Sequence, residues 1–194
     1  TDRAPLAQGS GGPGLTLLCV GTITPRKGHA VLVEGLARIA DRPWRLVCVG
    51  SVDRDPATTI DLRRRINAHG LGGRVVLTGE LDERAIDAYY DRADLFVLPS
   101  FHEGYGMVLA EALARGLPIV STRAGAIPDT VPEGAGHLVP PGNVEALADA
   151  LASLMDDRVL RARMAAGARA ARERLPLWDS ACGRFAAALA RAAA

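Results

Sequence analysis

The sequence predicts an α/β fold, with a doubly wound parallel sheet of about six strands and helices on both faces. Short apolar segments alternate with amphipathic helical segments along the chain, which is the pattern of a parallel sheet with crossover helices. The 194 residues are enough for one domain with its own core. They are 48 % hydrophobic and only 4 % aromatic, which is typical of an α/β domain rich in Ala, Leu and Val.

The start of the chain is predicted to be a linker. Residues 1–14 end in a Gly-Ser-Gly-Gly-Pro-Gly run. A glycine-rich phosphate loop follows a strand and opens a helix, whereas this run precedes the first predicted strand, at 15–20. We therefore interpret it as a hinge that leads into a domain at 15–175. The first helix is predicted over 29–40, where apolar residues recur at helical spacing.

The turn between the first strand and the first helix has the composition of an anion site. It carries Arg26, Lys27 and Gly28 directly before the helix. Anions bind where a parallel strand ends and a helix begins, because unpaired N–H groups and the helix dipole face that point. Lys27 is the one lysine among 23 Lys and Arg residues. The alternative is that this lysine occurs by chance in an arginine-rich chain.

Three strands and two helices are predicted in the middle of the chain. The strands are at 45–50, 74–78 and 94–99, and the helices run over 56–69 and from the loop at 79–82 to about 91. Asp53 and Asp55 have the spacing of a metal-binding Asp-x-Asp pair. Two Asp residues in a turn before a helix are more typical of turn and cap positions, so we predict that role.

Residues 101–120 are predicted to form a loop rich in glycine, a helix over 107–115 and a buried strand from about 118. Glu103 and Glu111 lie eight residues apart around the helix start. A continuous helix would separate them by about 12 Å. That distance suits the two ends of a sugar nucleotide and exceeds the roughly 5–9.5 Å of a glycosidase carboxylate pair. The alternative is two ordinary glutamates near a helix start.

The remaining elements are a short helix after 121–126, a strand at 136–139 and helices over 144–155, 159–173 and 177–193. Asn143 is predicted to cap the first of these three helices. The last helix, within a C-terminal segment at 176–194, carries one apolar stripe formed by Trp178, Phe185 and Leu189.

Composition excludes several classes of protein. A net charge of +1 argues against a nucleic-acid partner, and no apolar run reaches the roughly 20 residues of a membrane span. With no signal peptide recognised, we expect a cytoplasmic protein. The three cysteines, Cys19, Cys48 and Cys182, form no C-x-x-C motif. Cys19 and Cys48 fall in predicted strands, so we interpret them as small core residues in a reducing compartment, not as metal or redox groups.

Two adjoining motifs resemble those of a known family. Residues 99–106 read Pro-Ser-x-x-Glu-Gly-Tyr-Gly, and residues 111–120 read Glu-Ala-Leu-Ala-x-Gly-Leu-Pro-Ile-Val. This Glu-x7-Glu pattern resembles the donor-site signature of the retaining glycosyltransferases of family 4, also called glycosyl transferases group 1, which have the GT-B fold. The resemblance covers about residues 15–175 and implies one Rossmann-like half of such an enzyme, the C-terminal donor half. Residues 176–194 would then cross back to the missing acceptor half.

The resemblance implies transfer of a sugar from a nucleotide diphosphate sugar to an acceptor hydroxyl, with retention at the anomeric carbon. Lys27 and Glu103 would be catalytic, with Glu103 either positioning sugar hydroxyls or acting as nucleophile. Glu111 would bind the ribose, and Lys27 with Arg26 the diphosphate. The family's second phosphate-binding arginine is replaced by Thr22. The donor-binding set would be Arg26, Lys27, Gly28, Gly79, Leu81, Glu103, Gly104, Tyr105, Gly106, Met107 and Glu111.

No cofactor and no metal ion are implied, since side chains and a helix dipole would neutralise the leaving diphosphate. The implied partners are the nucleotide sugar, the missing N-terminal acceptor domain and, for the full enzyme, peripheral contact with the inner face of a membrane. Alone, this half is expected to be inactive. Two alternatives remain: a nucleotide-sugar-binding module that acts with a separate acceptor subunit, and a GT-B-fold sugar-nucleotide epimerase. The sequence does not name the sugar, the base or the acceptor.

Overall fold

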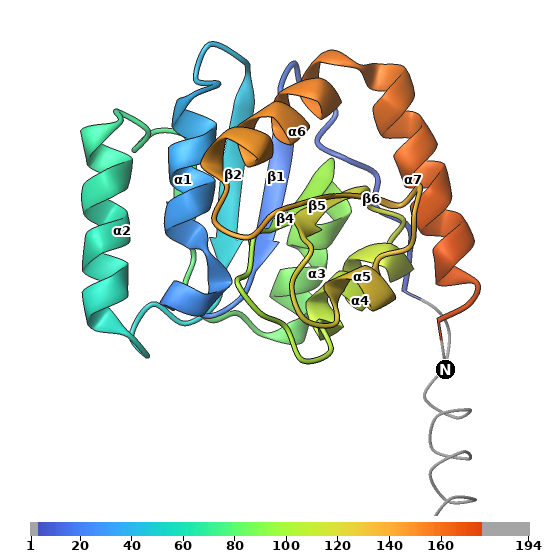
Figure 1. Cartoon of the computed structure of the whole chain (residues 1–194), viewed down its shortest axis with the longest axis horizontal. Helices are drawn as coiled ribbons and strands as arrows, with labels where there is room; N and C mark the ends of the chain where they lie inside the picture. The colour runs from blue at the N-terminus through green and yellow to red at the C-terminus, as the bar shows by residue number, and fades with distance from the viewer. Residues whose placement is uncertain (1–3, 176–194) are drawn as a thin grey trace, which may run out of the picture.

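The computed structural model describes residues 4–175 and places six strands in one parallel sheet (Figure 1). Their order is β3-β2-β1-β4-β5-β6, and each neighbouring pair is parallel. The predicted fold class is therefore confirmed. The strands are β1 (Leu15–Val20), β2 (Trp44–Val49), β3 (Val75–Leu77), β4 (Leu95–Leu98), β5 (Ile119–Thr122) and β6 (Gly136–Val139).

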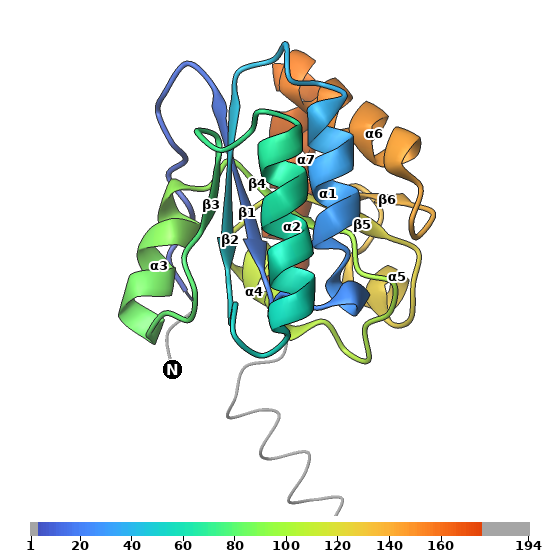
Figure 2. The same cartoon turned by 90° about the vertical axis from the view of Figure 1, so that its left-hand side faces the viewer.

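Helices cover both faces of the sheet. Figure 2 shows the sheet nearly edge-on, with α3 on one side and α1, α2 and α6 on the other. A 3₁₀ turn, η1 (Pro25–Lys27), precedes α1. The helices are α1 (His29–Ala37), α2 (Pro56–Ala68), α3 (Glu83–Arg92), α4 (Met107–Ala114), α5 (Ile127–Thr130), α6 (Val144–Asp156) and α7 (Arg158–Arg172).

The structure corrects the end of the first helix and supports two predicted caps. We predicted a helix to about residue 40, but α1 ends at Ala37 because the next N–H groups bond three residues back, as in a 3₁₀ turn. Asp55 caps α2 by accepting hydrogen bonds from the Thr58 N–H at 3.0 Å and the Thr58 hydroxyl at 2.7 Å. Asn143 caps α6 through the N–H of Ala146.

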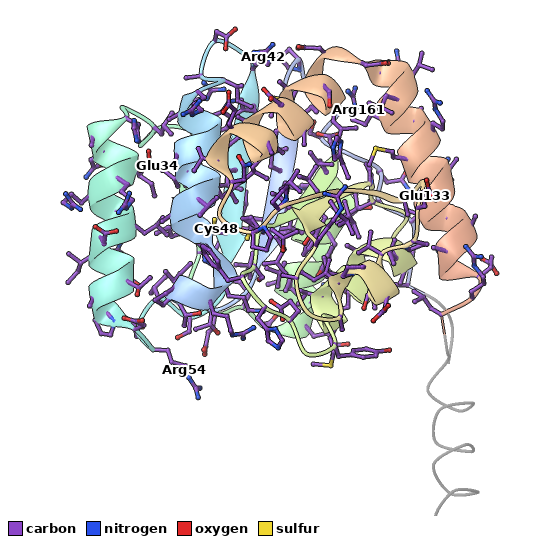
Figure 3. All side chains as sticks on the ribbon, viewed as in Figure 1. Glu34, Arg42, Cys48, Arg54, Glu133 and Arg161 are labelled. Atoms are coloured by element: carbon purple, nitrogen blue, oxygen red, sulfur yellow. The ribbon has the colours of Figure 1, made fainter. Side chains whose placement is uncertain are left out.

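The strand order creates a point where the direction of winding reverses. From β1 the chain moves outwards through β2 to β3, then returns to β4 beside β1 and moves outwards through β5 to β6. Loops at the carboxyl ends of β1 and β4 therefore diverge to opposite faces, which leaves a crevice typical of ligand sites. In Figure 3, Arg42 precedes β2 and Arg54 follows it, so Arg54 marks the edge where this crevice lies.

Buried strands form the centre of the core. All four residues of β4 and of β5 are buried, as are the last four of β1. Strands buried on both faces need continuous apolar sequence, which β4 and the last four residues of β1 and of β2 supply. The short strand β3 lies at the edge of the sheet and is only partly buried.

The N-terminal end of the described part is held by backbone hydrogen bonds and not by regular secondary structure. Residues 4–14 contain no helix or strand, but the N–H groups of Ala7 and Gln8 donate to the carbonyl oxygens of Arg115 and Asp91. The predicted helix over 177–193, with its apolar stripe, lies outside the described residues. Within the described residues, no helix is long and apolar enough to span a membrane.

Candidate functional site

The turn after β1 and the loop after β4 lie against each other at the crevice. Gly28 has a positive φ of 72°, and a Cβ atom at this position would lie 2.1 Å from the carbonyl oxygen of Pro99. Only glycine allows this backbone conformation and this close approach together. The Phe101 N–H also donates to the Arg26 carbonyl at 2.8 Å. The sheet order thus joins two segments that are far apart in the sequence.

An ion pair between Lys27 and Glu103 connects these segments. The Lys27 Nζ donates to Glu103 Oε1 at 2.7 Å, and the Ser100 hydroxyl donates to the same oxygen at 2.6 Å. Arg26 Nη1 lies 3.4 Å from Glu103 Oε2. The Glu103 side chain is only 7 % exposed and that of Lys27 13 %. The sequence predicted Arg26, Lys27 and Glu103 as site residues, but it predicted neither their pairing nor the part of Ser100.

The charge of Glu103 is stabilised despite its burial. Burial raises the pKa of this carboxyl, but the hydrogen bonds from Lys27 and Ser100 and the charges of Lys27 and Arg26 lower it by more. The pKa of Glu103 therefore lies below the usual value of a glutamate. At neutral pH the site holds one buried carboxylate and two cations that face the carboxyl ends of β1 and β4.

A second loop, after β5, holds Glu103 from the other side. The Ala126 N–H donates to the Glu103 carbonyl at 2.9 Å. Gly125 has φ of 56°, and a Cβ there would lie 2.2 Å from that same carbonyl oxygen. The sequence analysis did not identify Gly125 as a site residue. Only its place in a turn directly after a strand could have suggested it.

Residues 104–107 lead into α4, whose first residue is Met107. Gly106 occupies the N-cap position with φ of 76°, and no side chain caps the helix there. The first N–H groups of a helix lack partners within it and carry the positive end of its dipole. Tyr105 and Met107 beside them are 60 % and 69 % exposed. Gly104 is also exposed.

Glu111 is exposed on α4, and its orientation depends on Tyr90 of α3. The Tyr90 hydroxyl donates to Glu111 Oε2 at 3.0 Å. Burial and then the Glu111 charge raise the pKa of the Tyr90 phenol, so it stays protonated and remains a donor. The spacing of about 12 Å from Glu103 applies only to a helix that runs through both residues. The structure has the predicted loop and helix instead, since α4 begins at Met107 and Glu103 lies in the preceding loop, so that figure does not apply.

Gly79 and Leu81 also follow the carboxyl end of a strand, that of β3. The Gly50 N–H, after β2, donates to the Gly79 carbonyl at 3.0 Å. Gly50 in turn packs on the backbone of Gly21, in the turn that leads to Lys27. Gly79 has φ of 78° with open space where a Cβ would be, and Leu81 is half-buried. The structure thus places both residues at the same edge as the ion pair but gives them no direct contact with it.

The expectation for the two strand cysteines is confirmed in part. Cys19 and Cys48 are buried, with 0 % and 2 % exposure, as core residues should be. The sequence did not show that His29, the first residue of α1, lies against both of them. Among the described residues, these three are the group whose side chains could together hold a metal ion. None of them belongs to the predicted donor-binding set.

Most of the chain matches one family of known proteins. Residues 14–157 match the family described as Glycosyl transferases group 1. The chain is 36 % identical over 150 residues to a D-inositol 3-phosphate glycosyltransferase of Corynebacterium glutamicum, covering 75 % of this chain and 36 % of that protein. It is 36 % identical over 177 residues to a phosphatidyl-myo-inositol mannosyltransferase of Mycobacterium leprae, covering 88 % and 46 %.

Solved structures show the same fold. A sucrose-phosphate synthase of Thermosynechococcus elongatus superposes with a TM-score of 0.81 at 30 % identity, over 93 % of this chain and 46 % of that one. HepE of Anabaena, in complex with UDP and glucose, superposes with a TM-score of 0.83 at 25 % identity, over 91 % and 48 %. The chain thus spans roughly a third to a half of the length of the relatives described here.

Proposed function

The chain belongs to the glycosyl transferases group 1 family, and we propose that it is the donor-binding domain of a retaining glycosyltransferase. The enzyme would transfer a sugar from a nucleotide diphosphate sugar to an acceptor hydroxyl. The observation that carries this proposal is the buried Lys27–Glu103 pair at the reversal point of the sheet, directly before the uncapped start of α4. HepE, which has this fold, binds UDP and glucose, and this supports a nucleotide-sugar donor.

The diphosphate would bind between the turn before α1 and the start of α4. The Lys27 ammonium has three N–H donors and gives one to Glu103, so two remain for phosphate oxygens. Arg26 is half exposed and can add a second cation where the family's usual arginine is replaced by Thr22. Charge would develop on this leaving group during the reaction. Preorganised cations and helix N–H groups stabilise such charge without a metal ion.

The two glutamates would bind different parts of the donor. Glu103, in its loop, would accept hydrogen bonds from hydroxyls of the transferred sugar, with the backbone of residues 104–107 beside it. Glu111, held by Tyr90, would accept hydrogen bonds from the ribose hydroxyls. Gly79 and Leu81 would border the base. Of the two roles weighed for Glu103, positioning is supported better, because Lys27 and Ser100 both bond to Oε1 and reduce its nucleophilicity.

The complete reaction needs the other half of the protein. The chain spans less than half of each of the four relatives described above. We propose that the missing half binds the acceptor and closes the crevice over the donor. We further propose a cytoplasmic enzyme whose full-length form contacts a membrane surface peripherally. In this proposal the present chain binds the nucleotide sugar but does not transfer the sugar by itself.

Calorimetric titration of this chain with UDP, GDP and ADP tests the proposal, with and without added Mg²⁺. One of the three should bind selectively, and Mg²⁺ should leave its affinity unchanged. Lys27→Ala should lower the affinity for that diphosphate by about 10- to 100-fold, the range expected for a lost charge-assisted hydrogen bond. The affinity for the bare nucleoside should fall far less.

Arg54→Ala serves as the matched control, since Arg54 is an exposed cation at the same edge of the sheet. Equal affinity of wild type and Lys27→Ala for the diphosphate would remove Lys27 from the site. Failure of all three diphosphates to bind would contradict a complete donor site in this chain.

A further inference from the structure

Three metal-ligating side chains meet in the core below the turn that carries Lys27. Cys19 and Cys48 are register partners on the adjacent parallel strands β1 and β2, so their side chains leave the sheet on the same face. His29 begins α1, which packs on that face. The two Sγ atoms and a ring nitrogen of His29 all lie within 4.8 Å of one another. Figure 3 shows Cys48 in the interior of the molecule, beside α1.

The buried ring of His29 is unpaired within the part of the chain that the structure describes. It is 2 % exposed, and within the described residues neither Nδ1 nor Nε2 has a partner. Buried polar groups are almost always paired, because burying one without a partner costs free energy. The imidazole is therefore aimed at a group of sulfur atoms with its bonding capacity unused. A ligand that accepts both nitrogen and sulfur donors would use it.

We propose that Cys19, Cys48 and His29 bind one zinc ion, or a divalent ion of the same class. Thiolate and imidazole are the ligands that Zn²⁺ takes in proteins, at about 2.3 Å for sulfur and about 2.0–2.1 Å for nitrogen. Ligand atoms around one tetrahedral ion would lie roughly 3.5–3.8 Å apart, and the three atoms here lie within 4.8 Å of one another. A water molecule would take the fourth position of the ion. Two thiolates and a neutral imidazole cancel the charge of the ion, so the complex suits an apolar core.

The position of the site assigns it a structural role. It joins β1, β2 and the first residue of α1, and His29 follows Lys27 and Gly28 directly in the chain. A bound ion would therefore hold the turn that presents Lys27. The site is distinct from the crevice, and its existence does not depend on the proposed donor. Because the ligands are buried, the ion would bind during folding rather than enter the folded protein.

The full chain should be refolded from denaturant with Zn²⁺ or Co²⁺, dialysed and analysed for metal. Wild type should keep about one ion per chain, and the cobalt form should show thiolate-to-metal charge transfer and tetrahedral d–d bands. Cys19→Ala and Cys48→Ala should lose the stoichiometric ion and the cobalt bands, and His29→Phe should lose the stoichiometric ion. Cys182→Ala, which removes the remaining cysteine, is the matched control and should behave like wild type. Circular dichroism reports whether each variant folds.

The result for the wild type decides the proposal even if a variant fails to fold. Substoichiometric metal, or cobalt spectra without thiolate bands, would overturn it. Retention of the ion in folded Cys19→Ala or Cys48→Ala would also overturn it. A thiol titration in denaturant without reductant should find three free thiols; a count of one, with peptide mapping that assigns the disulfide to Cys19 and Cys48, would overturn the site. All of these measurements are made without nucleotide, so they are independent of donor binding.

Discussion

Burying the charge of Glu103 or of Lys27 alone would cost free energy, and their pairing offsets much of that cost. A buried ion pair loses hydration on both sides, and loss of one partner leaves an uncompensated charge. Here Ser100 and Arg26 add a hydrogen bond and a second cation. The pair therefore places a charged group at the crevice in a fixed position, ready for a ligand. Its stability is testable separately from any ligand.

Glu103→Gln should lower the free energy of unfolding by about 3 kcal/mol at neutral pH, because Lys27 loses its charged partner. The pKa of Glu103 is lowered in the folded state, so its contribution is present above the ordinary Glu pKa of about 4.3 and is lost as pH falls through the lower folded value. Urea unfolding from pH 3 to 7 should show the difference between wild type and variant shrinking in acid.

Glu133→Gln, at an exposed glutamate, is the control and should change stability by less than about 0.5 kcal/mol at every pH. A difference between Glu103→Gln and wild type that stays constant from pH 7 to pH 3 would contradict the ionised role of Glu103.

Tyr90 is a positioning residue for Glu111. Its ring stacks on Phe96 with centroids 6.1 Å apart, and the Arg115 guanidinium lies over it at 4.8 Å. The ring is thus fixed, and its hydroxyl points to Glu111 Oε2. If Glu111 binds ribose hydroxyls, loss of this one hydrogen bond should weaken the nucleotide without removing the carboxylate.

Tyr90→Phe should weaken binding of the preferred nucleoside diphosphate by about 3- to 10-fold, the range of one neutral or partly charged hydrogen bond. Titration calorimetry against the matched variant Tyr89→Phe, at the adjacent and half-buried tyrosine, isolates the effect. If both variants bind as tightly as wild type, Tyr90 does not position a ligand-binding carboxylate.

At the scale of elements, the turn between β1 and α1 is constrained by its packing against the end of β4. Gly28 combines a left-handed backbone with contact to the Pro99 carbonyl, so two separate effects oppose a side chain there. Gly70, at the end of α2, has a similar φ of 67° but open space around the position of a Cβ. Substitutions at the two positions therefore distinguish the cost of backbone strain from the cost of a steric clash.

Gly70→Ala should cost about 1–2 kcal/mol of unfolding free energy, which is the backbone strain alone. Gly28→Ala should cost at least about 2 kcal/mol more, because the turn must also move away from Pro99. Urea denaturation of both variants measures the difference. Equal costs would mean that the turn is not packed against β4 as described.

At the scale of the whole molecule, the sheet brings the 22–29 and 100–107 segments to one edge, although 76 residues separate Lys27 from Glu103. A ligand held by both segments should stabilise the fold as a unit. At 100 times its dissociation constant, the preferred diphosphate should raise the free energy of unfolding by about 2.7 kcal/mol.

Hydrogen exchange should then slow in both segments together. The loop at 41–43, which precedes β2 at the opposite end of the strands, supplies the internal control and should not change. Protection confined to one of the two segments would contradict a site shared between β1 and β4.

The sequence by itself determined the order and type of the elements, because apolar periodicity and caps are local properties of the chain. It predicted six strands, the caps at Asp55 and Asn143 and the start of α4 at Met107. It placed the helix ends less well, since the last turn of a helix often tightens to 3₁₀ hydrogen bonds, as that of α1 does. The candidate residues Lys27, Glu103 and Glu111 came from motifs and their resemblance to a family.

Only the tertiary structure decided which of these residues meet. Lys27 pairs with Glu103, Tyr90 with Glu111, Gly125 packs on the Glu103 carbonyl, and His29 faces Cys19 and Cys48. Cys19 and His29 lie in consecutive elements of the chain. Each of the other contacts joins segments whose distance from one another depends on strand order and register. Those are set by the packing of the whole sheet, to which many residues contribute and which no single motif encodes. Local sequence therefore supplied the chemical groups, and the fold supplied their partners.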